Sequence, residues 1–225
     1  MGSFSHPLKR SDMQILPQWL RPTGFLLAGL MMLAGSWSFL PDKPAKKQFV
    51  IEDNSRLFLK GTSNVNKFTC DCEDRYPAQT FEVEHTGSQV RFQNTSLAIA
   101  TRKFNCHNSK MDHDMQKALK ADKYPHIKIE LLETKQDANH VKSGSRASLE
   151  VHAKAKLTIC GVTKTQQITA KAQILSDGYF RLTGYQSILM TDFGIEPPTA
   201  LFGMIQVNNQ IDFHFDLYVR VSEVM

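Results

Sequence analysis

Residues 149–174 read LEVHAKAKLTICGVTKTQQITAKAQI, and apolar and polar side chains alternate on both sides of a short polar break. Successive side chains of an extended strand point to opposite faces, so this period of two gathers the apolar residues on one face. A helix is excluded, because it would spread Lys154, Lys156 and Lys171 around its circumference. Gly161 lies in the break and can adopt the positive φ that hairpin turns often need. The stretch therefore predicts an antiparallel β-hairpin with one solvent-exposed face.

The rest of the chain also has the alternation of strands, which gives an all-β fold class. In the terminal strand, the residues Ile211, Phe213, Phe215 and Leu217 face one way. Antiparallel sheets with one apolar face either pack as sandwiches or close into barrels. Periodicity does not decide between the two. Further strands are expected at residues 56–60, up to Cys72, and at 80–85, 89–92, 96–104, 126–133 and 179–190.

One stretch, residues 109–124, has the pattern of a short amphipathic helix instead. Met111, Met115 and Leu119 recur every four residues, and Pro125 ends the pattern. We expect this helix to lie at the barrel opening and help to close a cavity. The alternative is an ordinary helix docked on the outside.

The composition suits one all-β domain with an additional segment. The chain has 225 residues, is 41% hydrophobic and carries a formal net charge of +5. Its lysines are dispersed on outward strand positions, without an arginine cluster or interleaved aromatic residues, so no nucleic-acid partner is expected. No cofactor-binding motif is recognised.

The N-terminal region contains the uncharged stretch GFLLAGLMMLAGSWSFL at residues 24–40. It is somewhat short of the ~20 residues that a spanning helix needs. We interpret residues 1–40 as an apolar targeting helix, either a cleaved signal peptide or an uncleaved anchor that associates with the membrane. Residues 41–54 are expected to be a polar linker, and residues 55–225 the barrel domain.

The four cysteines of an exported chain can form a disulfide. Cys70 and Cys72 lie two apart on one strand and point the same way, so we expect Cys106 to bond to one of them. Cys160 is expected to stay free or semi-buried, at the end of its strand on the outward face. A metal site using Cys106 and two nearby histidines is an alternative, but its spacing fits no structural-zinc pattern.

Enzyme signatures are weak in this sequence. The histidines are spread over separate strands, and no Gly-x-Ser-x-Gly elbow occurs. The Asp112-His113-Asp114 run is interpreted as a solvated first helical turn rather than a catalytic group. No catalytic residue or metal ligand is therefore assigned.

Several local motifs resemble the YceI-like family of secreted lipid-binding proteins over roughly residues 55–221. They are MDHDMQKALKADKYPHIKIEL (111–131), AKLTICGVTKTQQI (155–168), TDFGI (191–195) and, more weakly, GTSNVNKF (61–68). The resemblance implies an extended, lipocalin-like antiparallel barrel with one short helix. It also implies an apolar cavity that holds a polyisoprenoid or isoprenoid quinone, and a bacterial periplasmic or secreted location. Residues 68–102 match the family poorly, and the oligomeric state stays open between monomer and homodimer.

The expected site is the inner face of the barrel. The alternative is a core filled by side chains, but the small residues Ala153, Ala155, Ala170 and Ala172 leave room for a ligand. The residues expected to line the cavity are Ala153, Ala155, Leu157, Ile159, Ile168, Ala170, Ala172, Met115, Leu119, Phe193, Ile211, Phe213, Phe215 and Leu217. We expect an exported, non-enzymatic carrier of an apolar isoprenoid lipid; the alternatives are an exported enzyme and a structural barrel with a filled core.

Overall fold

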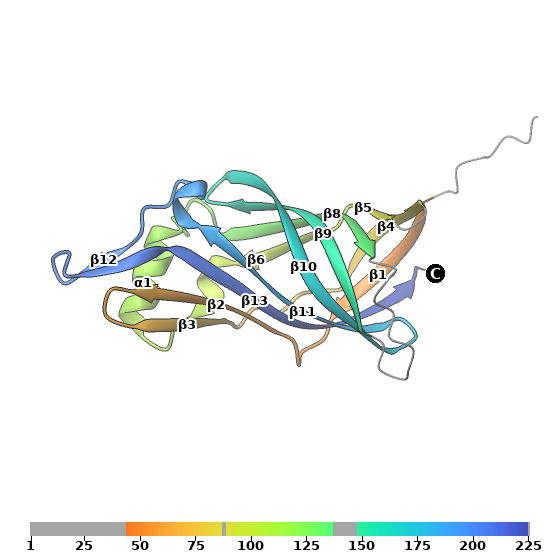
Figure 1. The fold of residues 1–225 in the computed structure, drawn as a ribbon, viewed down its shortest axis with the longest axis horizontal. Helices are drawn as coiled ribbons and strands as arrows, with labels where there is room; N and C mark the ends of the chain where they lie inside the picture. Colours follow the sequence, from red (N-terminus) through yellow and green to blue (C-terminus); the bar gives the residue numbers. More distant parts are fainter. Residues whose placement is uncertain (1–43, 87–88, 137–147, 225) are drawn as a thin grey trace, which may run out of the picture. The chain divides into compact units, whose positions relative to one another are not determined.

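The structure, a computed structural model, describes residues 44–86, 89–136 and 148–224. Residues 1–40 and 41–225 form separate units, and the described residues belong to the second. This unit is an extended antiparallel β-barrel with one short α-helix, as the sequence predicts (Figure 1).

The strands of the first half of the barrel are β1 (Ala45–Ile51), β2 (Arg56–Ser63), β3 (Lys67–Cys72), β4 (Gln79–Thr86), β5 (Gln89–Gln93), β6 (Ser96–Ala100) and β7 (Phe104–Asn105). The helix α1 (Ser109–Ala118) follows. The second half consists of β8 (His126–Gln136), β9 (Ser148–Ile159), β10 (Val162–Ser176), β11 (Tyr179–Leu189), β12 (Thr199–Ala200) and β13 (Ile205–Glu223). Short 3₁₀ turns occur at η1 (Thr101–Lys103) and η3 (Met190–Phe193).

The hairpin predicted at residues 149–174 is confirmed as β9 and β10. Ala153 pairs with Ile168 and Val151 with Ala170, so the apolar residues of both strands share one face. The turn consists of Cys160 and Gly161, both with positive φ, at 50° and 79°. This conformation matches a tight hairpin turn and explains why a glycine stands there.

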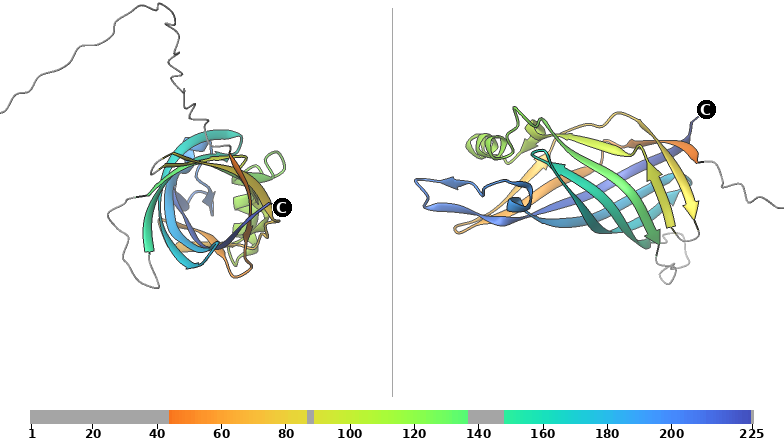
Figure 2. Two further views of the ribbon diagram at one scale, coloured as in Figure 1. Left: turned by 90° about the vertical axis from the view of Figure 1, so that its right-hand side faces the viewer. Right: turned by 90° about the horizontal axis from the view of Figure 1, so that it is seen from above.

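The long strand β13 closes the sheet into a barrel. Along one edge it pairs with β11, and along the other it pairs first with β2 and then, near its end, with β1. Since β1 also pairs with β4, a closed ring runs through β1, β4, β5, β8, β9, β10, β11 and β13. Figure 2 shows this ring from one end. Closure leaves these strands without free edges.

The sequence prediction of a polar linker over residues 41–54 is wrong for the seven residues of β1. Lys47 forms an ion pair with Glu223 at 3.0 Å, and the ring of Phe49 packs edge-on against Phe81 with the ring centroids 5.8 Å apart. Two lysines and a glutamine give the first part of this strand a polar composition, and its last three residues, Phe49, Val50 and Ile51, are apolar without alternation. The strand is recognisable mainly through its partners β4 and β13.

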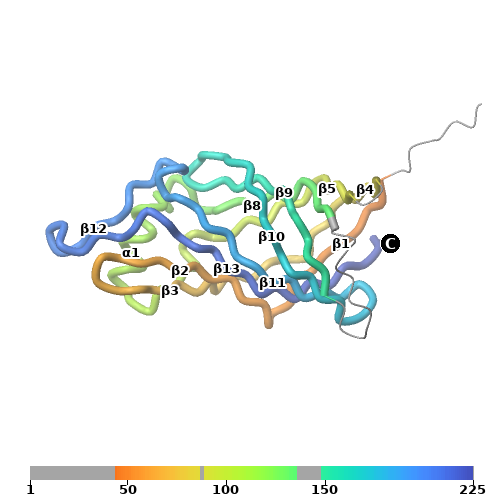
Figure 3. Tube along the Cα trace, viewed as in Figure 1, coloured from red at the N-terminus to blue at the C-terminus, as the bar shows by residue number. Residues whose placement is uncertain are grey.

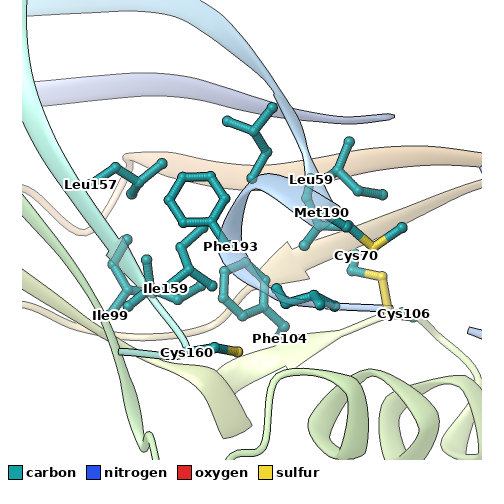
Figure 4. Packing of buried hydrophobic residues seen from close by; sticks show 14 residues of the cluster. Leu59, Cys70, Ile99, Phe104, Cys106, Leu157, Ile159, Cys160, Met190 and Phe193 are labelled. Atoms are coloured by element: carbon teal, nitrogen blue, oxygen red, sulfur yellow. A yellow bond between two sulfur atoms is a disulfide. The ribbon is translucent and has the colours of Figure 1, made fainter. Parts of the chain in front are cut away.

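The other end of the barrel is built differently. There β2 and β3 extend the sheet beside the first half of β13, although they lie far from it in the sequence (Figure 3). The main apolar core lies at this end and includes Phe104, Ile127, Ile159 and Phe193 (Figure 4). This end also carries α1 and β12, and the candidate site lies among these elements.

Within the described residues, no helix is long and apolar enough to span a membrane. The targeting helix expected at residues 24–40 lies outside the part of the chain that the structure describes.

Candidate functional site

An apolar cavity of about 390 Å³ lies at the end of the barrel that carries α1. Its walls come from β2, β3, β8, β9, β11, β13, α1, η3 and the segment between η3 and β13. The apolar residues that line it are Leu59, Phe68, Met111, Met115, Ala118, Leu119, Ile127, Ile159, Ile188, Met190, Ile195, Pro198, Ala200, Leu201, Ile205, Val207, Ile211 and Phe213. Such a surface recognises a ligand by shape and apolar area rather than by hydrogen bonds.

Polar residues of this cavity lie on the elements at the end of the barrel. They are Ser63, Asn66, Asn108, Lys110, Asp114 and Thr199, and most of them are exposed. The interior is therefore apolar and the rim is polar and wet. A long apolar molecule with a polar end group would fit this arrangement, with the end group at the rim.

The helix α1 is fixed at its start by two contacts. The Asn108 side chain accepts hydrogen bonds from the backbone N–H groups of Lys110 and Met111, which caps the helix. The backbone N–H of Cys106 donates to Asp112 Oδ1 at 2.6 Å. These contacts direct Met111 and Met115 towards the cavity, and methionines adapt well to irregular apolar ligands.

The helix ends at Ala118, earlier than the predicted residue 124. Lys120 has a positive φ of 50°, its N–H donates to the carbonyl of Lys117, and the N–H of Ala121 donates to that of Gln116. This is a Schellman motif, which usually contains glycine at the left-handed position. A lysine there gives no signal in the sequence, so the helical pattern extends up to Pro125.

A disulfide between Cys70 and Cys106 joins β3 to the segment just before α1, and both cysteines line the cavity (Figure 4). This confirms the prediction that Cys106 bonds to one of the two earlier cysteines. Cys70 is the partner because the pairing of Asp71 with Asn105 places Cys70 opposite Cys106. The alternative metal site would need the Cys106 thiolate as a ligand. This thiolate is not available, because the Cys106 sulfur is bonded to Cys70.

The two other cysteines are free. Cys160 is free, as expected, but it does not lie on the outward face, because it is buried beneath the end of α1. Its thiol donates to the carbonyl of Leu119 at 3.1 Å, and burial raises the pKa of the thiol. Burial also raises the pKa of Cys72, whose sulfur lies 3.5 Å from the Tyr76 hydroxyl. Both thiols are therefore held protonated, which argues against a nucleophilic role.

The residues predicted to line the cavity fall into two groups. Met115, Leu119, Ile159, Ile211 and Phe213 line it. The others lie in the core or further along the barrel, outside the lining of this cavity: Ala153, Ala155, Leu157, Ile168, Ala170, Ala172, Phe193, Phe215 and Leu217.

The small residues of the hairpin do not line this cavity, and a large side chain lies beside one of them, Ala170. Ala170 pairs with Gly184, and a Cβ atom at Gly184 would lie 2.5 Å from Cζ of Phe215. The Phe215 ring therefore occupies space beside Ala170 that the sequence suggested was empty. Further along, Leu217 and Val219 of β13 share a face with Leu182 and Phe180 of β11, and all four are half-buried. The apolar inner wall thus continues beyond the cavity.

Sequence reasoning missed the lining residues from two regions. Leu59 and Phe68 belong to the β2–β3 hairpin, and Met190, Ile195 and Val207 belong to the irregular segment before β13 and its start. The motifs GTSNVNKF and TDFGI mark these regions but do not show that they meet. Neither region has enough regular alternation to reveal which side chains point inward.

The described residues contain no group of three or more His, Cys, Asp or Glu side chains that could hold a metal ion. His107 contacts Asp71 through Nε2 at 2.9 Å, and Arg56 donates to the same carboxylate. The hydrogen bond from His107 is the main cause of the lowered pKa of Asp71. The cluster of Asp71, His107 and Arg56 lies on the outer surface. Its hydrogen bonds do not include the free thiols of Cys72 and Cys160.

Comparison with solved structures supports the fold. A polyisoprenoid-binding domain from Saccharophagus degradans, implicated in plant cell wall breakdown, is 13% identical with a TM-score of 0.54, over 77% of this chain and 98% of that one. BcnA from Burkholderia cenocepacia is 14% identical with a TM-score of 0.51, over 75% and 96% of the two chains. Nearly the whole of each of those solved chains is matched, so both adopt this fold without a counterpart of residues 1–40.

The comparison with curated protein sequences gives no match. The family model of the YceI-like domain matches residues 54–219. This range contains β2 to β12, α1 and nearly all of β13, and therefore every residue that lines the cavity. With well over half of its length matched, the chain belongs to the YceI-like family.

Proposed function

We propose that this protein is an exported, non-enzymatic carrier that holds a long apolar isoprenoid lipid, such as a polyisoprenoid or an isoprenoid quinone, in the cavity beside α1. The observation that carries the proposal is the contrast between the apolar interior of this cavity and its polar, exposed rim. Burial of apolar surface yields about 25 cal/mol per Å², which makes a flexible hydrocarbon a suitable ligand.

Three further observations support the proposal. The apolar inner wall continues along β11 and β13, so a chain longer than the cavity has a surface to follow. A solved structure with the same fold is described as a polyisoprenoid-binding domain. The disulfide is of a kind that persists in oxidising compartments, which fits the bacterial periplasm or the cell exterior.

Native mass spectrometry of the protein purified from a bacterial envelope, followed by lipid extraction, tests the proposal. The wild type is expected to carry an isoprenoid or to take one up from solution. Ala118→Phe fills the cavity from α1 and is expected to reduce the bound fraction severalfold. Lys117→Phe is the matched control, because it places the same side chain on the exposed side of the helix.

A folded wild type that neither carries nor takes up an isoprenoid would contradict the proposal and favour a filled barrel or an enzyme. Equal loss of ligand in both variants would show that the cavity is not the binding site. The intact mass in the same spectra reports whether residues 1–40 are removed, and hence whether residues 24–40 serve as a membrane anchor. It also reports whether the protein is a monomer or a homodimer.

A further inference from the structure

Two hairpin turns project at the end of the barrel that carries α1 (Figure 1). Both turns carry exposed apolar side chains. The β2–β3 turn presents Val65, and the β12–β13 turn presents Leu201, Phe202 and Met204. Their exposed fractions are 62%, 51%, 107% and 67%, respectively. We call these four residues the apolar tips. Apolar side chains gathered at such positions usually mark an interaction surface.

Hydrogen bonds hold the two turns together as one surface. The Asn64 side chain donates to the carbonyl of Met204 at 2.8 Å and accepts from the backbone N–H of Gln206 at 2.9 Å. The backbone N–H of Asn64 donates to the carbonyl of Gln206 at 3.0 Å. The apolar tips are therefore presented on a braced support rather than on two independent loops.

The backbone of the β12–β13 turn is unusual for its sequence. Leu201 and Phe202 have positive φ angles of 50° and 55°, a conformation that Gly, Asn and Asp adopt more readily. A turn that served folding alone would favour those residues. The retention of a leucine and a phenylalanine here points to a function of their exposed side chains.

The apolar tips are continuous with the cavity. Leu201 lines the cavity and is half exposed, so an apolar surface runs from the interior to the outside. Lys110 on the cavity rim and Lys67 at the start of β3 are both exposed near this end, and Asp114 is the acidic residue of the lining. Apolar side chains with neighbouring lysines complement a surface with a hydrocarbon interior and anionic headgroups.

We propose that the apolar tips insert into the surface of a lipid bilayer, so that the cavity opens onto the membrane and its ligand passes over Leu201 without crossing water. This inference rests on the proposed lipid-carrier function and adds to it the surface with which the carrier exchanges its ligand. A second copy of the chain is a poorer occupant. A stable protein interface needs about 800 Å² and 20–30 residues from each partner, whereas these turns offer two narrow projections.

The test uses a shorter chain, residues 41–225, because it lacks the apolar segment at residues 24–40. If the proposal is right, this shorter chain binds vesicles through the apolar tips. Both tryptophans of the protein, Trp19 and Trp37, are also absent from it. Phe202→Trp therefore introduces a single tryptophan at the turn. We expect its emission to shift to the blue on addition of phosphatidylethanolamine–phosphatidylglycerol vesicles, and to be quenched by brominated acyl chains.

Sedimentation with the same vesicles compares two paired substitutions. Phe202→Ser with Met204→Ser is expected to weaken binding by roughly tenfold or more. Ile174→Ser with Leu175→Ser is the matched control, since these exposed apolar residues lie by the β10–β11 turn at the opposite end of the barrel. This control is expected to bind as the wild type does. Circular dichroism establishes that each variant is folded.

Three results would overturn the docking proposal: no vesicle binding by the wild type, equal loss of binding in both paired variants, or no response of the tryptophan introduced by Phe202→Trp. A dimer in vesicle-free solution that Phe202→Ser with Met204→Ser abolishes would also overturn it, in favour of a second copy. Isoprenoid uptake, measured by native mass spectrometry on the same samples, separates the two proposals. Uptake without vesicle binding contradicts docking alone, and vesicle binding without uptake contradicts the carrier function alone.

Discussion

At the scale of single residues, His214 is held between two aromatic rings on the outer face of β13. Its ring is stacked on Phe58 with centroids 5.0 Å apart and on Tyr185 with centroids 5.5 Å apart. Burial lowers the pKa of His214, and the positive charge of Lys60 lowers it further, while Asp212 acts in the opposite direction. The folded protein therefore prefers the neutral imidazole.

This preference predicts a pH dependence of stability. Because the pKa of His214 is lower in the folded state, the unfolded chain binds more protons, and stability falls as the pH drops below about 6.5. His214→Phe keeps an aromatic ring in the stack and removes the titration. The wild type, measured by urea unfolding, should therefore lose stability relative to the variant between pH 7.5 and pH 5.

The control is Tyr185→Phe, which keeps the stack and His214. It should retain the wild-type pH dependence. A wild type that instead gains stability in acid relative to His214→Phe would show that attraction between the imidazolium and the rings outweighs the cost of burial.

The inward or outward direction of residues in regular strands could be predicted from the sequence, and register confirms it for Ala153 and Ile168. The burial of Cys160 could not. That residue follows the last inward position of β9, so alternation alone places it outside. The end of α1 covers it, and this contact depends on where a distant helix stops.

At the scale of elements, the Cys70–Cys106 disulfide connects β3 to the start of α1. The bond spans 36 residues of sequence, for which the chain-entropy estimate of stabilisation is about 3–4 kcal/mol. Cys70→Ala with Cys106→Ala should therefore lower the free energy of unfolding by that amount. It should also loosen α1 over the cavity, because Cys106 connects to Asp112 in the first turn of the helix. Denaturant unfolding and hydrogen exchange of α1 measure the two effects.

Cys72→Ala is the matched control for the disulfide, since Cys72 lies on the same strand and is free. It should change stability by much less, and reduction of the wild type should reproduce the loss in the double variant. An equal loss from Cys72→Ala would mean that packing at this end of β3, rather than the covalent bond, stabilises the site.

The existence of α1 could be predicted because its apolar residues recur every four positions, but its end could not, since Lys120 occupies the position that glycine usually takes. The contribution of the segment between η3 and β13 to the cavity could not be inferred from the sequence. Met190 and Ile195 face the cavity because the 3₁₀ turn η3 and Gly194, with φ of 67°, turn the chain there. Such turns have no period that indicates a direction.

At the scale of the whole molecule, the sequence predicts the barrel, but only some of the residues that it predicts at the cavity line the cavity beside α1. An inner face of small residues suggests a cavity at the level of the β9–β10 hairpin. The position of empty space also depends on which large side chains from other strands reach across, as Phe215 does beside Gly184 and its neighbour Ala170. The cavity forms where β2, β3, α1 and the segment before β13 widen the end of the barrel.

Closure of the barrel depends on β1, which pairs with both β4 and β13. A proline in the middle of this strand would remove a backbone donor and distort a strand that has partners on both sides. Gln48→Pro should therefore lower the free energy of unfolding by about 2–4 kcal/mol and should promote aggregation through the freed edges of β4 and β13. Ala45→Pro is the matched control and should cost much less, because Ala45 is the exposed first residue of the strand, a position where proline is tolerated. Thermal unfolding and size-exclusion chromatography measure both effects. If the two prolines were equally harmless, residues 41–54 would behave as the linker that the sequence suggests, and the ring would have to close without β1.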